Sequence, residues 1–524
     1  MKKQCLRMLS ILLLFCMLPF PGIAENVGEI LNIGMLLTRT MGIYPLNPAE
    51  RDIISVYSLV YESLVTIDDN GVPQPLLAEN WVESDGGATW TFTLRENIMF
   101  SDGTPLLASD VVASCQYILN MAKNRDLPEL SRGFYQNMRY LVASIRATDE
   151  RTVVVKGERS YFGLLYSMTF PIVPAAQVEM HSPVGTGPYL ITAFQPEYSR
   201  MMLAVNPGWW QAEPQVKDIG ITFYRNNKEM INAYEFGQVD TVFTRSVAAA
   251  QYKSGISSLS IPYSTRQMET LIMNHREFPL ESQKIRLALR YAINTQVISQ
   301  NAYMGMTSST NTPIPPDSWL YHDQESAFVF NPARAAELLA EEGWADTDND
   351  GILDKAIVVN GENVKRNLQL RLFVYEDPEN DVRFETASLI IEMLRTLKIG
   401  VSFNSVTYEQ QLERLEAGSF DLALCSFQMD VVPDVGFFLM QGNQQNYGRY
   451  NSNEMTSLIN TLRTNEDRND FAYTTQAIQQ QFEADVPFIC LFYRAGAILT
   501  RKMFTTVRSI REFELLRGIE AFGR

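Results

Sequence analysis

Two carboxylates interrupt an otherwise apolar stretch near the end of the sequence. The segment Leu424–Leu439 reads LCSFQMDVVPDVGFFL, in which a strand-like run ending at Phe427 is followed by Asp430 and Asp434. In open α/β sheets, ligands bind beyond the carboxyl ends of the strands. We therefore predict that Asp430 belongs to a binding site. The alternative is that it caps a turn or helix beginning near Val435.

The sequence lacks the signatures of common catalytic sites. It has no G-x-S-x-G elbow, no G-x-x-x-x-G-K-[ST] loop and no H-E-x-x-H motif, and its three histidines, His181, His275 and His322, are well separated. Two aspartates four residues apart on one loop do not supply the opposed carboxylates that glycoside hydrolysis requires. We predict that the protein is not an enzyme. A hydrolase that uses Asp430 and Asp434 is the less favoured alternative.

A second group of acidic residues resembles the start of a calcium loop. In the segment DTDNDGILD, Asp346, Asp348, Asp350 and Asp354 occupy the first, third, fifth and ninth positions of such a loop. The twelfth position, which needs a bidentate glutamate, holds Ile357. These four aspartates are therefore a weak candidate for a structural calcium site, and a solvated turn is the favoured alternative. No other cofactor is expected.

The first 24 residues predict a cleavable signal peptide. Basic residues precede the apolar run Met8–Phe20, and small residues before Glu25 suit a cleavage site. The run is too short for a comfortable membrane span, and no later segment approaches ~18 uninterrupted apolar residues. Cys16 does not follow the small-residue pair at the cleavage point that lipid attachment normally needs. We predict an exported protein, periplasmic or extracellular, without a lipid anchor.

Charge and cysteine content narrow the choice of partners. The formal net charge of −16 should repel nucleic acid and anionic membranes. Beyond the signal the chain contains Cys115, Cys425 and Cys490, an odd number in a chain large enough not to need disulfides. Buried free thiols are the favoured interpretation, and a Cys425–Cys490 bridge is the alternative.

The periodicity of the sequence predicts two α/β lobes. Strands and helices alternate in two regions. In the first, the strands Val216–Tyr224 and Val239–Phe243 flank the helix Lys228–Phe236. In the second, the strands Leu368–Tyr375, Ile399–Val406 and Phe420–Phe427 are separated by the helices Glu379–Leu397 and Tyr408–Ala417. This alternation favours largely parallel sheets covered by helices. The nearly continuous apolar run Val486–Tyr493 predicts a central strand that returns the chain to the first lobe.

Other local signals complete the segmentation. Asn331 followed by Pro332 predicts a helix start, and Gly343 predicts its end, so we expect a helix over Pro332–Glu342. Residues 61–183 differ from the rest, with short alternating runs between turn clusters and a helix near Ser109–Met121. We interpret this region as an inserted α+β subdomain.

Several segments resemble a known family. They are Leu59–Val112, Gly185–Ile191 (GTGPYLI), Asn206–Trp210 (NPGWW), Gly237–Asp240 (GQVD) and Ile285–Asn294 (IRLALRYAIN). Together they resemble the peptide-binding group of bacterial extracellular solute-binding proteins, which includes dipeptide-, oligopeptide- and nickel-binding receptors of ABC importers. The likeness runs from about residue 29 to the C-terminus.

The resemblance implies a two-lobed α/β periplasmic-binding-protein fold, type II-like, with the inserted α+β subdomain. The signal peptide covers residues 1–24. The first lobe covers residues 25–60, 184–265 and 486–524, and the subdomain covers 61–183. The second lobe covers residues 266–485. The implied function is to capture a short peptide and deliver it, as a monomer, to an ABC permease. A non-peptide solute such as an oligosaccharide, an opine or a metal complex is the alternative. The shortage of histidines argues against direct transition-metal ligation.

The resemblance also implies ligand-binding residues. In peptide-binding members, an aspartate in a W-x-A-D-Y-x-D-P segment pairs with the ligand's α-ammonium. Phe427 matches the tryptophan, Met429 the alanine and Asp430 the aspartate, whereas Val431 departs from the aromatic that usually follows. The backbone around Gln428 would hydrogen-bond an extended peptide as an added strand.

Four further side chains are predicted at the cleft from their positions alone. Met41 and Ile43 follow the first expected strand, Tyr135 lies in the subdomain, and Tyr493 ends the late strand. Methionine and aromatic side chains suit a pocket that accepts varied apolar groups. Ordinary packing is the alternative for each of them.

Overall fold

The computed structural model describes most of the chain. The described residues are 30–37, 42–48, 50–124, 126–127, 133–255, 258–322, 330–376, 382–430, 432–443, 445–465, 467–501, 512–516 and 518–519. The predictions made for the signal peptide, for Met41 and for Val431 lie outside them. No helix in these ranges has the length and apolar character that a membrane crossing requires.

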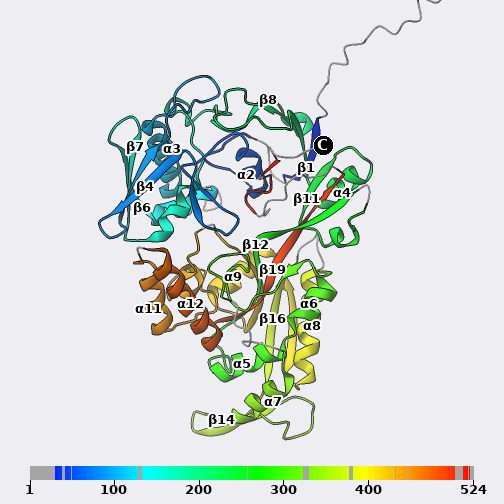
Figure 1. The fold of residues 1–524 in the computed structure, drawn as a ribbon. Coiled ribbons are helices and arrows are strands. Elements are labelled where there is room, and N and C mark those ends of the chain that lie inside the picture. Colours follow the sequence, from blue (N-terminus) through cyan, green and yellow to red (C-terminus); the bar gives the residue numbers. More distant parts are fainter. Residues whose placement is uncertain are drawn as a thin grey trace, which may run out of the picture.

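One 11-stranded sheet runs through both lobes (Figure 1). Its strand order is β17-β16-β18-β12-β19-β11-β1-β10-β9-β8, and β13 also pairs with β19. The strands are β1 (Leu31–Leu36), β8 (Tyr189–Gln195), β9 (Arg200–Val205), β10 (Asp218–Tyr224), β11 (Thr241–Thr244), β12 (Leu259–Met273), β13 (Thr307–Ser308), β16 (Gln369–Tyr375), β17 (Gly400–Val406), β18 (Leu422–Gln428) and β19 (Phe488–Thr500).

Two long antiparallel strands, β12 and β19, join the lobes. The end of β19 pairs with β11 of the first lobe, whereas β12 pairs with β18 of the second lobe from Gln267 onward. The predicted late strand is therefore central, as expected, but it continues to Thr500. β12 passes the predicted lobe boundary at residue 266 without a break, and the domain boundaries themselves stay predictions.

The second lobe contains the predicted β-α-β-α-β unit. β16 pairs in parallel with both β17 and β18, and the crossovers are α8 (Val382–Thr396) and α9 (Tyr408–Ala417). Thr407 caps α9 by accepting a hydrogen bond from the backbone N–H of Gln410, and Gly418 ends it with a φ of 69°. These local signals give α9 the bounds predicted from the sequence.

The remaining helices pack around this sheet and the subdomain. As predicted, Asn331 caps the helix that begins at Pro332, through the backbone N–H of Arg334. The helices are α2 (Arg51–Tyr57), α3 (Ala108–Lys123), α4 (Asn227–Glu235), α5 (Gln283–Ala292), α6 (Thr295–Ala302), α7 (Pro332–Glu341), α10 (Gly436–Leu439), α11 (Asn453–Leu462) and α12 (Arg468–Asp485).

The inserted subdomain is a separate antiparallel sheet with its own helix. Its strand order is β4-β5-β7-β6, with α3 packed against β6 and β7. The strands are β4 (Ala78–Ser84), β5 (Thr89–Leu94), β6 (Val142–Ala147) and β7 (Thr152–Gly157). Two hairpins complete the structure, β2 (Val65–Ile67) with β3 (Pro73–Pro75), and β14 (Asp354–Val359) with β15 (Glu362–Asn367). The predicted fold class, two α/β lobes with an inserted α+β subdomain, is confirmed.

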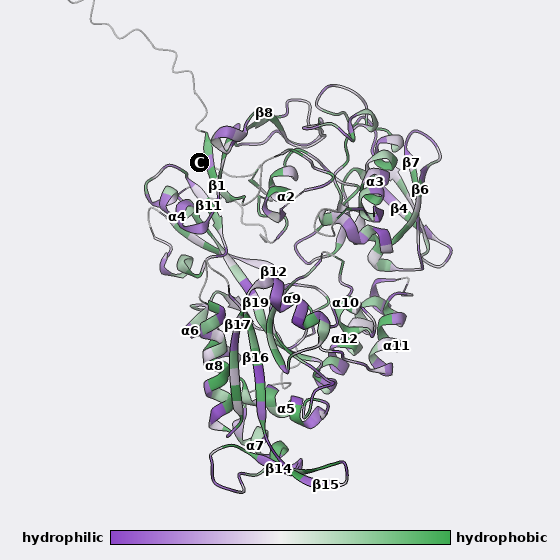
Figure 2. Ribbon diagram, turned by 180° about the vertical axis from the view of Figure 1, so that it is seen from behind, coloured by the Kyte–Doolittle hydropathy of each residue, from purple (hydrophilic) through white to green (hydrophobic). Residues whose placement is uncertain are grey.

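Apolar side chains hold these parts together. One core cluster extends from the first lobe through the subdomain into the second lobe, and another fills the second lobe alone. Figure 2 shows the β14–β15 hairpin, with both hydrophilic and hydrophobic residues along it, projecting from the far end of the second lobe. Cys115, Cys425 and Cys490 are buried free thiols, so that interpretation is confirmed. Cys425 and Cys490 flank Thr270 on opposite neighbouring strands, which prevents their pairing.

Candidate functional site

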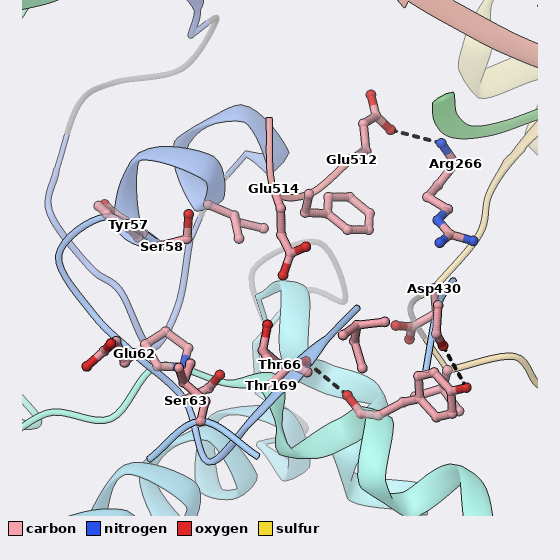
Figure 3. Close-up of a pocket in the computed structure, with 18 of the residues that line it drawn as sticks. Tyr57, Ser58, Glu62, Ser63, Thr66, Thr169, Arg266, Asp430, Glu512 and Glu514 are labelled. Carbon is pink, nitrogen blue, oxygen red and sulfur yellow. Dashed lines mark hydrogen bonds between the residues drawn. The ribbon is translucent and has the colours of Figure 1, made fainter. Parts of the chain in front are cut away.

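A cavity of about 500 Å³ lies between the lobes. Every part of the fold contributes to its wall (Figure 3). Its charged lining residues are Glu62 and Arg95 of the subdomain, Arg266 and Asp430 of the second lobe, and Glu512 and Glu514 near the C-terminus. Tyr57, Tyr135, Tyr166 and Trp210 provide aromatic surface. The volume falls within the usual range for small-molecule sites.

Asp430 reaches this cavity because its strand ends beside it. β18 stops at Gln428, and the next residue, Met429, donates its backbone N–H to the Arg266 carbonyl at 2.8 Å. The Asp430 carboxylate accepts a hydrogen bond of 2.8 Å from the amide of Asn137, which lies on a 3-10 helix of the subdomain. Asp430 therefore lies where the second lobe meets the subdomain.

Asp434 has a different environment. Its Oδ2 pairs with Arg463 Nε at 2.7 Å, and its Oδ1 accepts the backbone N–H of Gly436 at 2.7 Å. These contacts tie the loop after β18 to the start of α10. Asp434 thus orients the loop and is not among the residues that line the cavity.

The second lobe contacts the subdomain around the cavity. Trp319 Nε1 of the second lobe donates to the Tyr166 hydroxyl at 2.8 Å, and the backbone N–H of Phe162 donates to the Asn465 carbonyl at 3.0 Å. The rings of Phe162 and Phe471 also pack, with centroids 5.5 Å apart. With the Asn137–Asp430 bond, these contacts join the second lobe to the subdomain beside the cavity.

Glu62 is a deeply buried carboxylate of the cavity wall, at 6% exposure. Trp210 Nε1 donates to both of its oxygens at 3.2 and 3.0 Å, and Trp209 Nε1 donates to Oε1 at 3.2 Å. Burial raises the pKa of Glu62 to about 7, although the Trp210 hydrogen bond opposes this shift. Our sequence reasoning missed this residue. Its signal was a lone charge in the apolar run Leu59–Val65.

The raised pKa of Glu62 predicts a pH-dependent stability. The folded protein holds this proton more tightly than the unfolded chain, so the contribution is fully present below about pH 4.5 and is lost as the pH rises through about 7. Relative to Glu62→Gln, the wild type should lose up to about 3 kcal/mol of unfolding free energy between pH 4.5 and 8, at about 1.36 kcal/mol per pKa unit. Urea unfolding at several pH values measures this difference.

The control for this prediction is Glu392→Gln on the exposed side of α8. The difference between this variant and the wild type should not change with pH. Glu483 also has a pKa raised to about 7 by burial, but it titrates in all three proteins and cancels from the comparison. A difference between wild type and Glu62→Gln that is equally independent of pH would show that Glu62 remains ionised in the folded state.

A buried ion-pair network fixes the C-terminal part of the wall. Arg245 donates to both carboxylate oxygens of Asp52 at 2.8 Å and to Glu512 Oε1 at 3.0 Å. Burial opposes the charge on Arg245, but Asp52 and Glu512 outweigh it and raise its pKa well above the usual value. The network joins the segment 512–516 to α2 and to the residues that follow β11.

The other predicted ligand-binding residues occupy two environments. Tyr135 and Met429 line the cavity with Asp430. Ile43 and Tyr493 are buried outside its lining, and the Tyr493 hydroxyl donates to the Pro313 carbonyl at 2.7 Å. Phe427 is buried in an aromatic cluster, and Gln428 is exposed, with its amide 3.5 Å from Glu512. The structure thus brings three of the eight predicted residues together around the cavity.

Lysines accompany the predicted calcium loop. The carboxylates of Asp346, Asp348 and Asp354 lie within 4.8 Å of one another, whereas Asp350 is outside this group and accepts the backbone N–H of Ile352. Lys398 pairs with Asp346 at 2.8 Å, and Lys365 pairs with Asp348 and, at 3.6 Å, with Asp354. Ile357, at the twelfth position, lies on β14. This arrangement favours an ion-paired surface turn, and calcium binding stays a prediction.

A second recess, of about 1210 Å³, lies within the second lobe. Its lining is polar and includes His275, Arg286, Arg449 and Asp485, and none of its lining residues comes from the first lobe or the subdomain. A ligand bound there would not contact both lobes. The smaller cavity between the lobes is therefore the better candidate for a site that closes on its ligand.

Comparison with known proteins identifies the family. The chain is 24% identical over 501 residues to heme-binding protein A of Haemophilus influenzae, covering 89% of this chain and 87% of that protein. Its fold matches NikA from Brucella suis in complex with Fe(III)-EDTA, with a TM-score of 0.75 at 18% identity over 92% and 99% of the two chains. It also matches the oligopeptide-binding protein AppA from Bacillus subtilis in complex with a nonapeptide, with a TM-score of 0.67 at 20% identity over 94% and 99%.

The family model described as bacterial extracellular solute-binding proteins, family 5 middle, matches residues 72–449. The resemblance noted in the sequence is thereby confirmed, and so is the prediction that the chain is not an enzyme. The chain belongs to this family of extracellular solute-binding proteins, as a receptor for a small solute that works with an ABC permease.

Proposed function

We propose that this receptor captures a short peptide between its lobes and delivers it to the permease as a monomer. The observation that carries the proposal is the cavity lined by both lobes, with the Asp430 carboxylate in its wall. A partly buried carboxylate is compensated best by a cation, and the α-ammonium of a peptide supplies one. The volume of about 500 Å³ suits a peptide of a few residues.

Closure is the mechanism that the contacts support. A ligand stabilises the closed form only to the extent that it binds that form more tightly than the open one. A peptide that contacts Asp430 on one side and the Trp210 side of the cavity on the other makes both sets of contacts only when the lobes meet. The closed state would then report occupancy to the permease.

A non-peptide solute is the second candidate. Heme-binding protein A, the relative aligned over 501 residues, is named for a ligand that is not a peptide. Against direct metal capture, the described lining of the cavity includes no histidine or cysteine. Mass spectrometry of the small molecules released from natively purified protein by mild denaturation distinguishes these two classes.

Asp430→Asn should weaken peptide binding by about 10- to 100-fold, because a hydrogen bond between charged groups contributes about 1.5–3 kcal/mol. Isothermal titration calorimetry with a pool of dipeptides and tripeptides measures the effect. Asp470→Asn, an exposed change on α12, is the matched control and should leave affinity unchanged. Equal affinity of the Asp430→Asn variant and the wild type would remove Asp430 from the site. Failure of the wild type to bind any peptide would overturn the peptide proposal.

A further inference from the structure

We propose that Arg266 is the specificity-determining residue of the cavity and binds a carboxylate group of the solute. This inference rests on the proposed function of the cavity and deepens it, because it names a chemical group that the solute carries. It stands on three observations. A bulge directs the side chain into the cavity, the guanidinium has no partner among the described residues, and charged groups surround it.

A β-bulge places Arg266 at the cavity. In the β12–β19 ladder, Ser264 pairs with Ala495 and Met268 pairs with Tyr493. Between these two pairs β12 advances by four residues, whereas β19 advances by two. Bulges of this kind bend a strand and redirect its side chains. The extra residues include Arg266, whose guanidinium points into the cavity in Figure 3.

The backbone of Arg266 is fixed from two sides. Its N–H donates to Glu512 Oε2 at 3.1 Å, and its carbonyl accepts the N–H of Met429 at 2.8 Å. The first contact comes from the C-terminal segment and the second from the loop that carries Asp430. Arg266 is therefore positioned before a ligand arrives, which reduces the entropy lost on binding.

The guanidinium itself has no ion-pair or hydrogen-bond partner within the described part of the chain, although the residue is partly buried. Glu512 lies near Arg266, but its carboxylate pairs with Arg245 and accepts the backbone N–H of Arg266. Partial removal of a charged group from water is costly without compensation. A carboxylate compensates a guanidinium best, because the two planar groups form a pair of parallel hydrogen bonds.

The other charges of the cavity define the rest of the solute. Asp430 and Glu514 line the same cavity and place negative charge beside Arg266. A solute with one carboxylate and one cationic group satisfies both signs, whereas a purely anionic solute meets repulsion from the two acids. Because Arg266 lies where β12 passes between the lobes, the carboxylate would be bound at the hinge itself.

The test compares free acids with amides. Titration calorimetry uses a tripeptide pool with free carboxyl termini and the same pool as carboxamides, on the full-length mature protein. The wild type should bind the acids at least tenfold more tightly than the amides. Arg266→Gln should reduce this ratio to about one, and Arg266→Lys should keep part of it. Arg366→Gln, exposed on β15, should behave as the wild type.

The outcomes distinguish a failure of this inference from a failure of the proposed function. Equal binding of acids and amides by the wild type would overturn the role of Arg266 and leave peptide capture intact. An acid preference that persists in Arg266→Gln would also overturn it. If Arg266→Gln does not fold, the conservative Arg266→Lys variant decides, because an unchanged acid-to-amide ratio there contradicts bidentate recognition. Failure of both pools to bind the wild type would overturn the inference together with the peptide proposal.

Discussion

Replacing Arg245 with methionine should lower the free energy of unfolding by about 3–5 kcal/mol, because it leaves two buried carboxylates without their cation. Asp52 is 5% exposed and Glu512 is 3% exposed, so water cannot take the place of the guanidinium. The loss should exceed that expected for removing one hydrogen bond, about 1 kcal/mol. Urea unfolding at pH 7 measures it.

Two controls separate the network from a general effect of losing arginine. Arg334→Met removes an exposed arginine that pairs with Glu337 and Glu341 on α7, and it should change stability far less because water screens surface ion pairs. A triple variant, Arg245→Met with Asp52→Asn and Glu512→Gln, removes the stranded charges and should recover much of the loss. An Arg245→Met variant as stable as Arg334→Met would contradict the proposed energetics.

The network also connects stability with binding. Glu512 pairs with Arg245 through one oxygen and accepts the backbone N–H of Arg266 through the other. Loss of Arg245 therefore loosens the segment that holds Arg266 at the cavity. We expect Arg245→Met to weaken ligand binding as well, without any direct contact between Arg245 and the solute.

Local signals in the sequence were enough to predict many elements. The helix Tyr408–Ala417 was predicted with its bounds, with Gly418 as its end, and the structure adds Thr407 as the cap at its start. β12 was not predicted, since it contains Pro262 and several polar residues and shows no clean alternation. It is stable because β18 and β19, which are distant in sequence, pair along its two edges. Such pairing leaves no local pattern.

The same distinction applies to the site. Asp430 was found because it follows a strand that its own sequence reveals, and the cavity does include it. Arg266 lies between Ser264 and Met268, where nothing in the sequence shows that β12 advances by four residues while β19 advances by two. Glu62 had a visible signal, but its significance depends on Trp209 and Trp210, about 150 residues later in the chain.

Phe427→Ala should lower the free energy of unfolding by about 3–5 kcal/mol, the usual cost of truncating a buried phenylalanine. The ring is 7% exposed, and its centroid lies 5.4 Å from that of Phe438 and 6.2 Å from that of Phe488. Tyr447 stacks on it at 6.5 Å. These contacts predict a packing role for a residue that the family resemblance assigned to the ligand, and urea unfolding measures the loss.

Phe427→Leu separates packing from binding. Leucine fills much of the same space, so this variant should lose less than about 1.5 kcal/mol of stability and keep its affinity for the peptide pool. If the ring contacts the solute, Phe427→Leu should instead remain stable and bind several-fold more weakly. Since Phe427 precedes Asp430 by three residues, a packing role still matters for function, because the aromatic cluster fixes the end of β18 from which the carboxylate reaches the cavity.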